Sequence, residues 1–203
     1  MAAPRRTPVR STRDRMVDSA VALLRERSSA GVTIDAVLAH SGAPRGSMYH
    51  HFPQGRDQLV REGVERAGRH VTRLIADCDG SPGQVVDQLL EFWEHVLEET
   101  DHQAGCPVVA LTVDADDAGR RVVKEVFGRW HAGLLDAFNC NGIAPERADR
   151  LATLVIAAGE GAVLMCRAER TAEPLRAVIE ELRLVLDMAY PSRVDLRRTD
   201  PKT

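Results

Sequence analysis

The chain has 203 residues, of which 44% are hydrophobic, enough to bury a core in one domain or two small ones. We find no apolar run of about 18 residues that would span a bilayer, and the first residues, MAAPRRTPVRSTRDR, lack the apolar stretch of a secretion signal. The sequence therefore predicts a globular protein of the cytoplasm.

The net charge of -3 hides an uneven distribution along the chain. Residues 1–75 carry 13 Lys and Arg against 7 Asp and Glu, whereas the remainder carries 14 against 23. Cationic side chains gain affinity for a polyanion by releasing its counterions, so a basic N-terminal part is compatible with a nucleic-acid partner. Many charged surfaces serve solubility alone, and charge by itself leaves both interpretations open.

Cysteine spacing indicates no metal site. The four cysteines are scattered and show neither CxxC nor the Cys/His spacing of a zinc site; they are Cys78, Cys106, Cys140 and Cys166. We expect reduced and mostly buried thiols, with redox sensing as the alternative. The sequence predicts neither a metal nor a cofactor.

Almost every segment is predicted to be helical, because apolar residues recur three and four positions apart and no alternation with a period of two is sustained. The predicted helices cover residues 11–28, 34–41, 44–51, 56–77, 83–100, 107–114, 117–138, 145–169 and 173–189. In the first, Arg13, Arg15, Arg25 and Arg27 are expected to face solvent or phosphate. Thr33 is expected to cap the second helix, and Pro44 to start the third.

Two of these short helices are joined by a tight turn that contains Gly42. The apolar positions expected to hold them together are Ile34, Val37, Leu38, Met48 and Phe52. Such spacing fits a helix-turn-helix, whose second helix enters the major groove of DNA. Arg45 would then read guanine, and Ser47 or His50 a base or a phosphate. On geometry alone, an ordinary helical hairpin with a polar surface is the alternative.

Residues 33–59, TIDAVLAHSGAPRGSMYHHFPQGRDQL, resemble the DNA-binding motif of the TetR family of bacterial transcriptional regulators. The match includes the glycine of the turn, the Gly-small-apolar-Tyr-x-His-Phe stretch and a basic residue that opens the next helix. Pro44 replaces a small hydroxyl residue, and PQGR is one residue longer than the usual segment. With GCPVVALTVDADD at residues 105–117, these departures are similar to the subgroup that includes LmrA and YxaF.

The resemblance implies an all-α fold. Residues 1–76 would form a three-helix helix-turn-helix domain with the start of a connecting helix, and residues 77–203 a helical domain for ligand binding and dimerisation. The residues implied to approach bases are Arg45, Gly46, Ser47 and His50. Those implied to contact phosphates are Thr33, Tyr49, His51 and Arg56. Phosphate contacts set position, whereas base contacts decide sequence.

The helices of the second domain must bury their apolar faces on one another, and plain core packing is the simplest role for their large side chains. In TetR-like proteins the middle helices enclose a cavity for a small molecule. The residues expected to line it are Trp93, Val96, Leu97, Phe127, Trp130, Leu134 and Phe138. The last two helices are implied to form the dimer interface, through Gly159, Gly161, Leu175, Val178, Ile179, Leu182 and Leu186.

Glu160 lies within the apolar stretch LATLVIAAGEGAVLMC, where an unpaired buried charge would be costly. Its predicted partner is a ligand group or an arginine across a dimer interface; simple exposure is the third possibility. His95, His102 and His131 are expected to be surface or packed residues.

We therefore expect a ligand-responsive repressor: a homodimer that binds double-stranded operator DNA and is released from it by a small, largely apolar molecule. A transcriptional activator or a nonspecific DNA-binding protein is the alternative. No catalytic residue is predicted, because a Gly-rich phosphate loop and a GxSxG elbow are missing. Helix capping explains the acids Asp114, Asp116 and Asp117.

Overall fold

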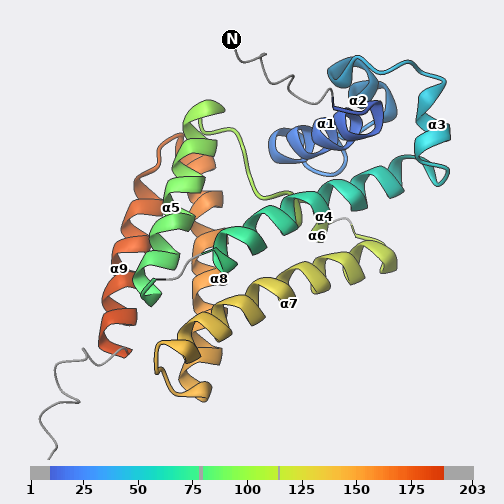
Figure 1. The fold of residues 1–203 in the computed structure, drawn as a ribbon. Helices are drawn as coiled ribbons and strands as arrows, with labels where there is room; N and C mark the ends of the chain where they lie inside the picture. Colours follow the sequence, from blue (N-terminus) through green and yellow to red (C-terminus); the bar gives the residue numbers. More distant parts are fainter. Residues whose placement is uncertain (1–9, 78–79, 114, 190–203) are drawn as a thin grey trace, which may run out of the picture.

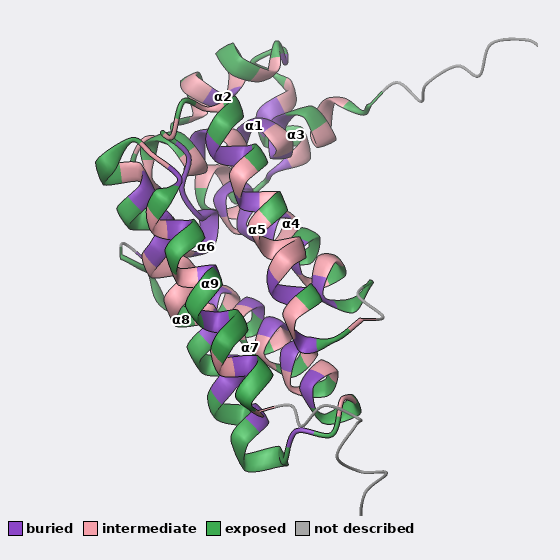
Figure 2. Ribbon diagram, turned by 90° about the vertical axis from the view of Figure 1, so that its left-hand side faces the viewer, coloured by how far each residue is buried: buried purple, intermediate pink, exposed green. Residues whose placement is uncertain are grey.

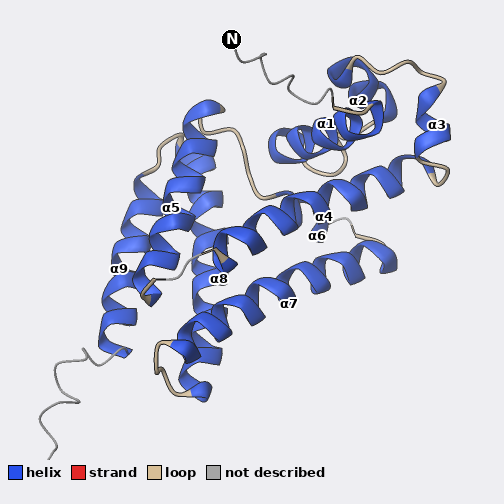
Figure 3. Ribbon diagram, in the orientation of Figure 1, coloured by secondary structure: helices blue, strands red, loops and turns tan. Residues whose placement is uncertain are grey.

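The computed structural model describes residues 10–77, 80–113 and 115–189, so Cys78, Asp114 and both chain ends lie outside it. All regular structure in these residues is helical (Figure 3). The helices are α1 (Thr12–Arg27), α2 (Ile34–Ser41), α3 (Ser47–His51), α4 (Gly55–Ala76), α5 (Pro82–Glu99), α6 (Pro107–Thr112), α7 (Asp117–Cys140), α8 (Pro145–Glu169) and α9 (Glu173–Ala189). The all-α prediction is confirmed.

Most predicted boundaries lie within about two residues of the observed ones, as expected where caps and breaks are strong. The third helix is the exception: it was expected from Pro44 but begins at Ser47. The Ser47 amide donates to Pro44 O at 3.0 Å and the Met48 amide to Arg45 O at 3.3 Å, so this segment starts as a turn. Arg45 and Gly46 therefore lie in the turn that precedes α3.

The N-terminal unit consists of α1, α2, α3 and the first half of α4, gathered at one end of the molecule (Figure 1). Thr33 caps α2 by accepting a hydrogen bond from the Ala36 amide at 3.1 Å, as predicted. Gly42 ends α2 in the left-handed region, with φ of 64°, a conformation that glycine adopts without a Cβ penalty. Buried Met48 and Phe52 then fix the short α3 against the unit.

Ion pairs brace α1 on α4. Arg66 donates to both Asp14 and Asp18 at 2.6 Å, and Arg13 pairs with Glu62 at 2.6 Å. Hydrogen bonds from Ser11 and Arg66 lower the pKa of Asp14. Part of the basic charge of the N-terminal unit is therefore neutralised by acidic side chains of the same unit.

Helix α4 continues from this unit into the C-terminal body, where it packs on α7 (Figure 1). The Trp130 indole donates to Gly68 O at 2.9 Å. A Cβ atom on Gly68 would lie only 2.6 Å from Val126 Cγ1, so glycine allows the two helices this close approach. Helices α8 and α9 complete the body, and Figure 2 shows the buried positions on the inward sides of its helices.

Helix α8 is the most apolar of the long helices in the described residues. By length and composition alone it could cross a membrane. In this structure it packs between α7 and α9, with Leu151, Val155 and Val163 buried. Its apolar composition is that of a helix with contacts on more than one side.

Two alanine substitutions, one at the contact between α4 and α7 and one away from it, should have opposite effects on the free energy of unfolding. Gly68→Ala should destabilise the fold by about 1–3 kcal/mol, because the rigid Val126 side chain must move. Gly128→Ala on α7 meets nothing within 4 Å and should stabilise by up to about 1 kcal/mol through helix propensity. Urea unfolding of both variants measures this; a Gly68→Ala variant as stable as Gly128→Ala would contradict the proposed close contact.

Candidate functional site

The outer face of α3 and the turn before it carries polar side chains that the fold leaves accessible. Tyr49 is 65% exposed, although the buried Met48 precedes it in sequence. His50 is also exposed, whereas Ser47 and His51 are half-buried. The imidazole rings of His50 and His51 lie edge to face, with their centroids 5.0 Å apart. A face with hydroxyl and imidazole donors at the end of the molecule can meet a polyanion without any rearrangement of the core.

Arg45 and Gly46 extend this face at its N-terminal side. Arg45 is exposed and forms an ion pair with Asp35 of α2. A Cβ atom on Gly46 would meet nothing within 4 Å, so no neighbour in the described chain requires glycine there. Ser47 Oγ donates to Pro44 O at 2.6 Å. The guanidinium is thus held by a solvent-exposed pair, which contributes little free energy and exchanges partners easily.

Thr33 and Arg56 occupy a second position, beside the loop between α1 and α2. Thr33 is exposed, and its hydroxyl already caps α2. Arg56 Nε donates to Val32 O at 2.8 Å, and its Nη2 donates to Ser29 O. Arg56 therefore holds this loop against α4, a structural role that its position in the sequence does not reveal.

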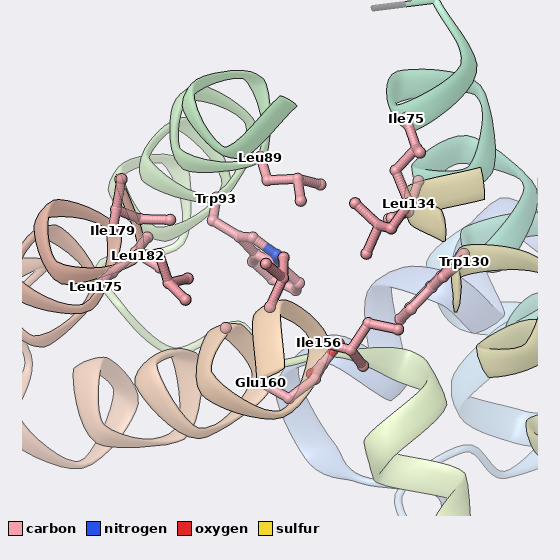
Figure 4. Close-up of a pocket in the computed structure, with 13 residues that line it drawn as sticks. Ile75, Leu89, Trp93, Trp130, Leu134, Ile156, Glu160, Leu175, Ile179 and Leu182 are labelled. Carbon is pink, nitrogen blue, oxygen red and sulfur yellow. The ribbon is translucent and has the colours of Figure 1, made fainter. Parts of the chain in front are cut away.

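An apolar cavity lies in the body, bounded by α4, α5, α7, α8 and α9 (Figure 4). Its volume is about 40 Å³, so it has room for little more than water. The lining residues are Val71, Ile75, Leu89, Trp93, Trp130, Leu134, Val155, Ile156, Gly159, Glu160, Leu175, Ile179 and Leu182.

Three of the predicted pocket residues line this cavity: Trp93, Trp130 and Leu134. The others do not. Val96, Leu97 and Phe138 are buried elsewhere in the core, and Phe127 packs edge to face on Trp130 with centroids 5.4 Å apart. Helical periodicity identifies an apolar face but not which part of that face borders a void. The contributions of α4 and α9 to the lining were missed for the same reason.

The predicted dimer residues of α9 also need correction. Leu175, Ile179, Leu182 and Leu186 are at most 4% exposed within the single chain, and the first three border the cavity. They pack inward because α9 lies against α5 and α8, where Arg176 pairs with Glu94 and Arg183 with Asp87, both at 2.6 Å. Of the other predicted contacts, Gly159 lines the cavity, while Val178 and Gly161 are half-buried.

Other apolar side chains of the last two helices face outward. They are Leu154, Leu164 and Met165 of α8, with Leu184 and Met188 of α9. On α8 these positions lie seven residues before and three and four residues after Gly161, so all four share one side of the helix. We call these six residues the outer apolar face.

Glu160 is the one charged residue of the cavity lining. Its Oε2 is buried and has no hydrogen-bond partner among the described residues. Burial raises the pKa of Glu160 to about 7, while a hydrogen bond with Cys106 opposes the rise. Burial likewise raises the pKa of the Cys106 thiol well above its ordinary value. Of the three predicted environments for Glu160, simple exposure is excluded.

The segment that carries Cys106 touches the N-terminal unit. The Gly105 amide donates to Arg25 O at 2.8 Å, and Arg167 Nη2 of α8 donates to Glu26 O at 2.7 Å. Arg25 was expected to face solvent or phosphate, but it lies over the Phe92 ring at 5.8 Å and its Nε is buried. Burial lowers the pKa of Arg25. The end of α1 is therefore fastened to the body close to the cavity.

No group of three or more His, Cys, Asp or Glu side chains in residues 10–77, 80–113 and 115–189 is placed to hold a metal ion. His131 contacts Asp149, and His95 contacts Glu99, both on the surface of the body. His102 is half-buried in the left-handed turn after α5.

Comparison with protein families divides the chain in the same way as the fold. Residues 16–62 match the family of bacterial regulatory proteins described as the tetR family. Residues 82–181 match the C-terminal domain described as transcriptional regulator LmrA/YxaF-like. The first match contains α2 and α3, and the second contains most of the cavity.

Relatives of similar length support both matches. An HTH-type transcriptional regulator of Mycobacterium tuberculosis is 41% identical over 89% of this chain and 97% of its own. The HTH-type transcriptional regulator LmrA of Bacillus subtilis is 26% identical over 81% of this chain and 90% of its own. The HTH-type transcriptional repressor DhaR of a Mycobacterium species is 26% identical over 92% of this chain and 95% of its own.

Solved structures show the same fold. The regulatory protein TetR from Rhodobacter sphaeroides superposes with a TM-score of 0.77 at 20% identity, covering 85% of this chain and 97% of that one. These relatives are regulators and not enzymes. The chain therefore belongs to the TetR family of bacterial transcriptional regulators, with a C-terminal domain of the LmrA/YxaF-like type.

Proposed function

We propose that this DNA-binding regulator is a repressor in the cytoplasm, which leaves its operator when a small molecule occupies the cavity of the body. The observation that carries the proposal is the connection of the exposed face of α3 to that cavity through one helix, α4. Val71 and Ile75 at one end of α4 line the cavity, and Arg56 at the other holds the loop before α2. One helix can thus carry a displacement between the two places.

In the proposed DNA complex, α3 lies in the major groove. Arg45, Ser47 and His50 contact bases, and Gly46 allows close approach of the backbone. Thr33, Tyr49, His51 and Arg56 contact or position phosphates. Arg45 exchanges the Asp35 carboxylate for a guanine edge, an exchange that is inexpensive because the pair is solvent-exposed.

The small volume of the cavity supports the ligand response. A small molecule larger than water fits only when the surrounding helices separate, so it binds the separated arrangement more tightly. By linkage, the factor by which ligand weakens operator binding equals the factor by which operator weakens ligand binding. The typical coupling is about 1–3 kcal/mol.

Dimerisation is proposed to use the outer apolar face, the six residues of α8 and α9 defined above. Leu164 and Met165 are each 51% exposed and Met188 is 80% exposed, an arrangement that favours burial by a second copy. A two-fold dimer places two α3 helices on the two half-sites of a pseudo-palindrome.

Operator binding is tested with the intergenic DNA that flanks the gene of this protein, by fluorescence anisotropy against a scrambled duplex. Arg45→Ala should weaken specific binding by about 5- to 150-fold, the equivalent of about 1–3 kcal/mol for a base contact. Tyr49→Phe should weaken it by about two- to tenfold through loss of one hydrogen bond. Arg147→Ala, which removes an exposed charge from α8, serves as the control and should change little.

Equal binding of flanking and scrambled DNA, unchanged by Arg45→Ala, would favour a nonspecific DNA-binding protein. A footprint that overlaps the polymerase site would support repression, and one placed upstream would support activation.

The dimer interface is tested by Leu164→Asp, which places a charge on the outer apolar face. We expect sedimentation equilibrium to show a monomer. Operator affinity should fall at least about tenfold, because a monomer binds one half-site without a linked second subunit on the other. Val113→Asp changes another exposed apolar residue, at the end of α6, and should leave the dimer intact. A Leu164→Asp variant that remains dimeric would place the interface elsewhere.

A further inference from the structure

The cavity combines an apolar wall with one acidic group. Apart from Gly159 and Glu160, all its lining residues are aliphatic or aromatic, and they come from five helices. In Figure 4, Glu160 extends from α8 on the side where Trp130 and Ile156 lie, and Trp93 of α5 lies across from them. A ligand in this space would have its polar contacts concentrated at one point.

Glu160 lacks the partners that a buried carboxylate normally has. No Lys, Arg or His among the described residues forms an ion pair with it. The Cys106 thiol is its hydrogen-bonding neighbour, and Oε2 is left with none. A buried acceptor without a donor costs about 1–3 kcal/mol, more for a charged group, and each such group in a native protein needs an explanation.

The alternative partner, an arginine of a second copy, is disfavoured by burial. Glu160 lines the cavity and its Oε2 is buried within the single chain, whereas Leu164 and Met165 of the outer apolar face are each 51% exposed. The carboxylate is therefore accessible to a molecule inside the cavity rather than to the neighbouring subunit.

We propose that the cavity binds an amphipathic cation, an apolar body that carries one protonated amine, and that Glu160 binds the amine. This inference rests on the proposed function, in which the cavity is the effector site. An ammonium group supplies both the counter-charge and the N–H donor that Oε2 lacks. A carboxylate ligand would meet an uncompensated negative charge in an apolar wall, and a neutral ligand would leave the ionised form of Glu160 unpaired.

The tryptophans favour the same ligand class. The chain has two, Trp93 and Trp130, and both line the cavity. Indole faces attract cations more strongly than other aromatic rings do. Trp130 is held in place because its indole N–H donates to Gly68 O, so its ring remains in the cavity wall.

The protonation state of Glu160 makes the affinity for the ligand depend on pH. With a pKa of about 7, the carboxyl loses its charge as the pH falls through neutrality, and a cation binds the charged form. Cys106 stays protonated over this range because burial raises its pKa. The lining residues of α4, α5, α7 and α9 are apolar. His70 of α4 contacts the Phe92 ring, and the pKa of His70 is lowered by burial and by the charges of Arg73 and Arg25.

The experiment titrates the full-length protein with three probes of similar shape: phenylbutylamine, phenylbutanol and phenylbutanoate. Fluorescence of Trp93 and Trp130 reports occupancy of the cavity directly, because the chain has no other tryptophan. We expect the amine to bind at least about tenfold more tightly than the alcohol at about pH 8, and the carboxylate to bind least. Amine affinity should fall by about tenfold between about pH 8 and pH 6, while alcohol affinity stays constant.

Glu160→Gln keeps the shape of the side chain and removes its charge. In this variant the amine should bind at least about tenfold more weakly at about pH 8, and its pH dependence should disappear. Glu98→Gln, an exposed position on α5, is the matched control and should leave amine binding unchanged. Equal binding of amine and alcohol, or amine binding unchanged in Glu160→Gln, overturns the proposal.

Thermal unfolding shows whether the variant folds. The pKa of Glu160 is raised from its ordinary 4.5 to about 7, so the unfolded chain loses this proton first; stability therefore falls as the pH rises from about 4.5 to about 7, and the loss is complete above that range. Glu160→Gln should therefore melt at a higher temperature than the parent at about pH 8 and at a similar temperature at about pH 4, where Glu160 is protonated in both the folded and the unfolded chain. If the variant melts at a lower temperature than the parent at both pH values, the pH dependence of amine binding to the unsubstituted protein decides the proposal.

Operator binding separates this inference from the proposed function. Specific operator binding without any binding of the amine overturns the ligand class and leaves the DNA-binding role intact. Amine binding that depends on Glu160 but does not change operator affinity supports the ligand class and contradicts the effector role of the cavity.

Discussion

Helix α4 packs against α1 with its first half and against α7 with its second, and the positions of both the α3 face and the cavity depend on these two contacts. A Cβ atom on Gly63 would lie 3.4 Å from Ala20 Cβ and from Leu24 Cδ1, while Gly68 brings α4 against Val126 of α7. Because both contacts use glycine, the helix has little freedom to slide past either neighbour. A change in the body is therefore transmitted as a movement of α4 as a whole.

A second link between the two units runs through the segment before α6. Gly105 binds the last turn of α1, and the next residue, Cys106, binds Glu160 in the cavity. A ligand that replaced Cys106 as the hydrogen-bond partner of Glu160 would thus affect α1 through Cys106 and Gly105. Two connections, one by helix packing and one by hydrogen bonds, join the cavity to the N-terminal unit, and their relative contributions can be separated by double-mutant cycles.

The buried carboxyl of Glu160 lowers the stability of the fold. An apolar cavity lined by a glutamate is a costly arrangement for folding alone, since a hydrophobic side chain of similar size would satisfy the core better. A group of this kind is typical of a functional site, where a perturbed pKa and an unsatisfied atom occur together. Because Oε2 is buried in a small apolar cavity, little water screens the electrostatic interaction of Glu160 with any bound group.

The sequence by itself determined the helices, the turn at Gly42 and the apolar contacts of the helix-turn-helix, where Val37, Met48 and Phe52 are buried and Ile34 and Leu38 are half-buried against the core. Caps, breaks and apolar periodicity are local properties. It also identified Glu160 as anomalous, since a charge within an apolar helical stretch needs a partner. Tertiary structure alone decided what each apolar face contacts. Leu175, Ile179 and Leu182 have the periodicity of an interface, but a cavity and a neighbouring helix of the same chain occupy that side. The Arg56 and Arg25 side chains likewise became structural through partners 24 and 67 residues away in the chain, Val32 O and the Phe92 ring, which no local pattern encodes.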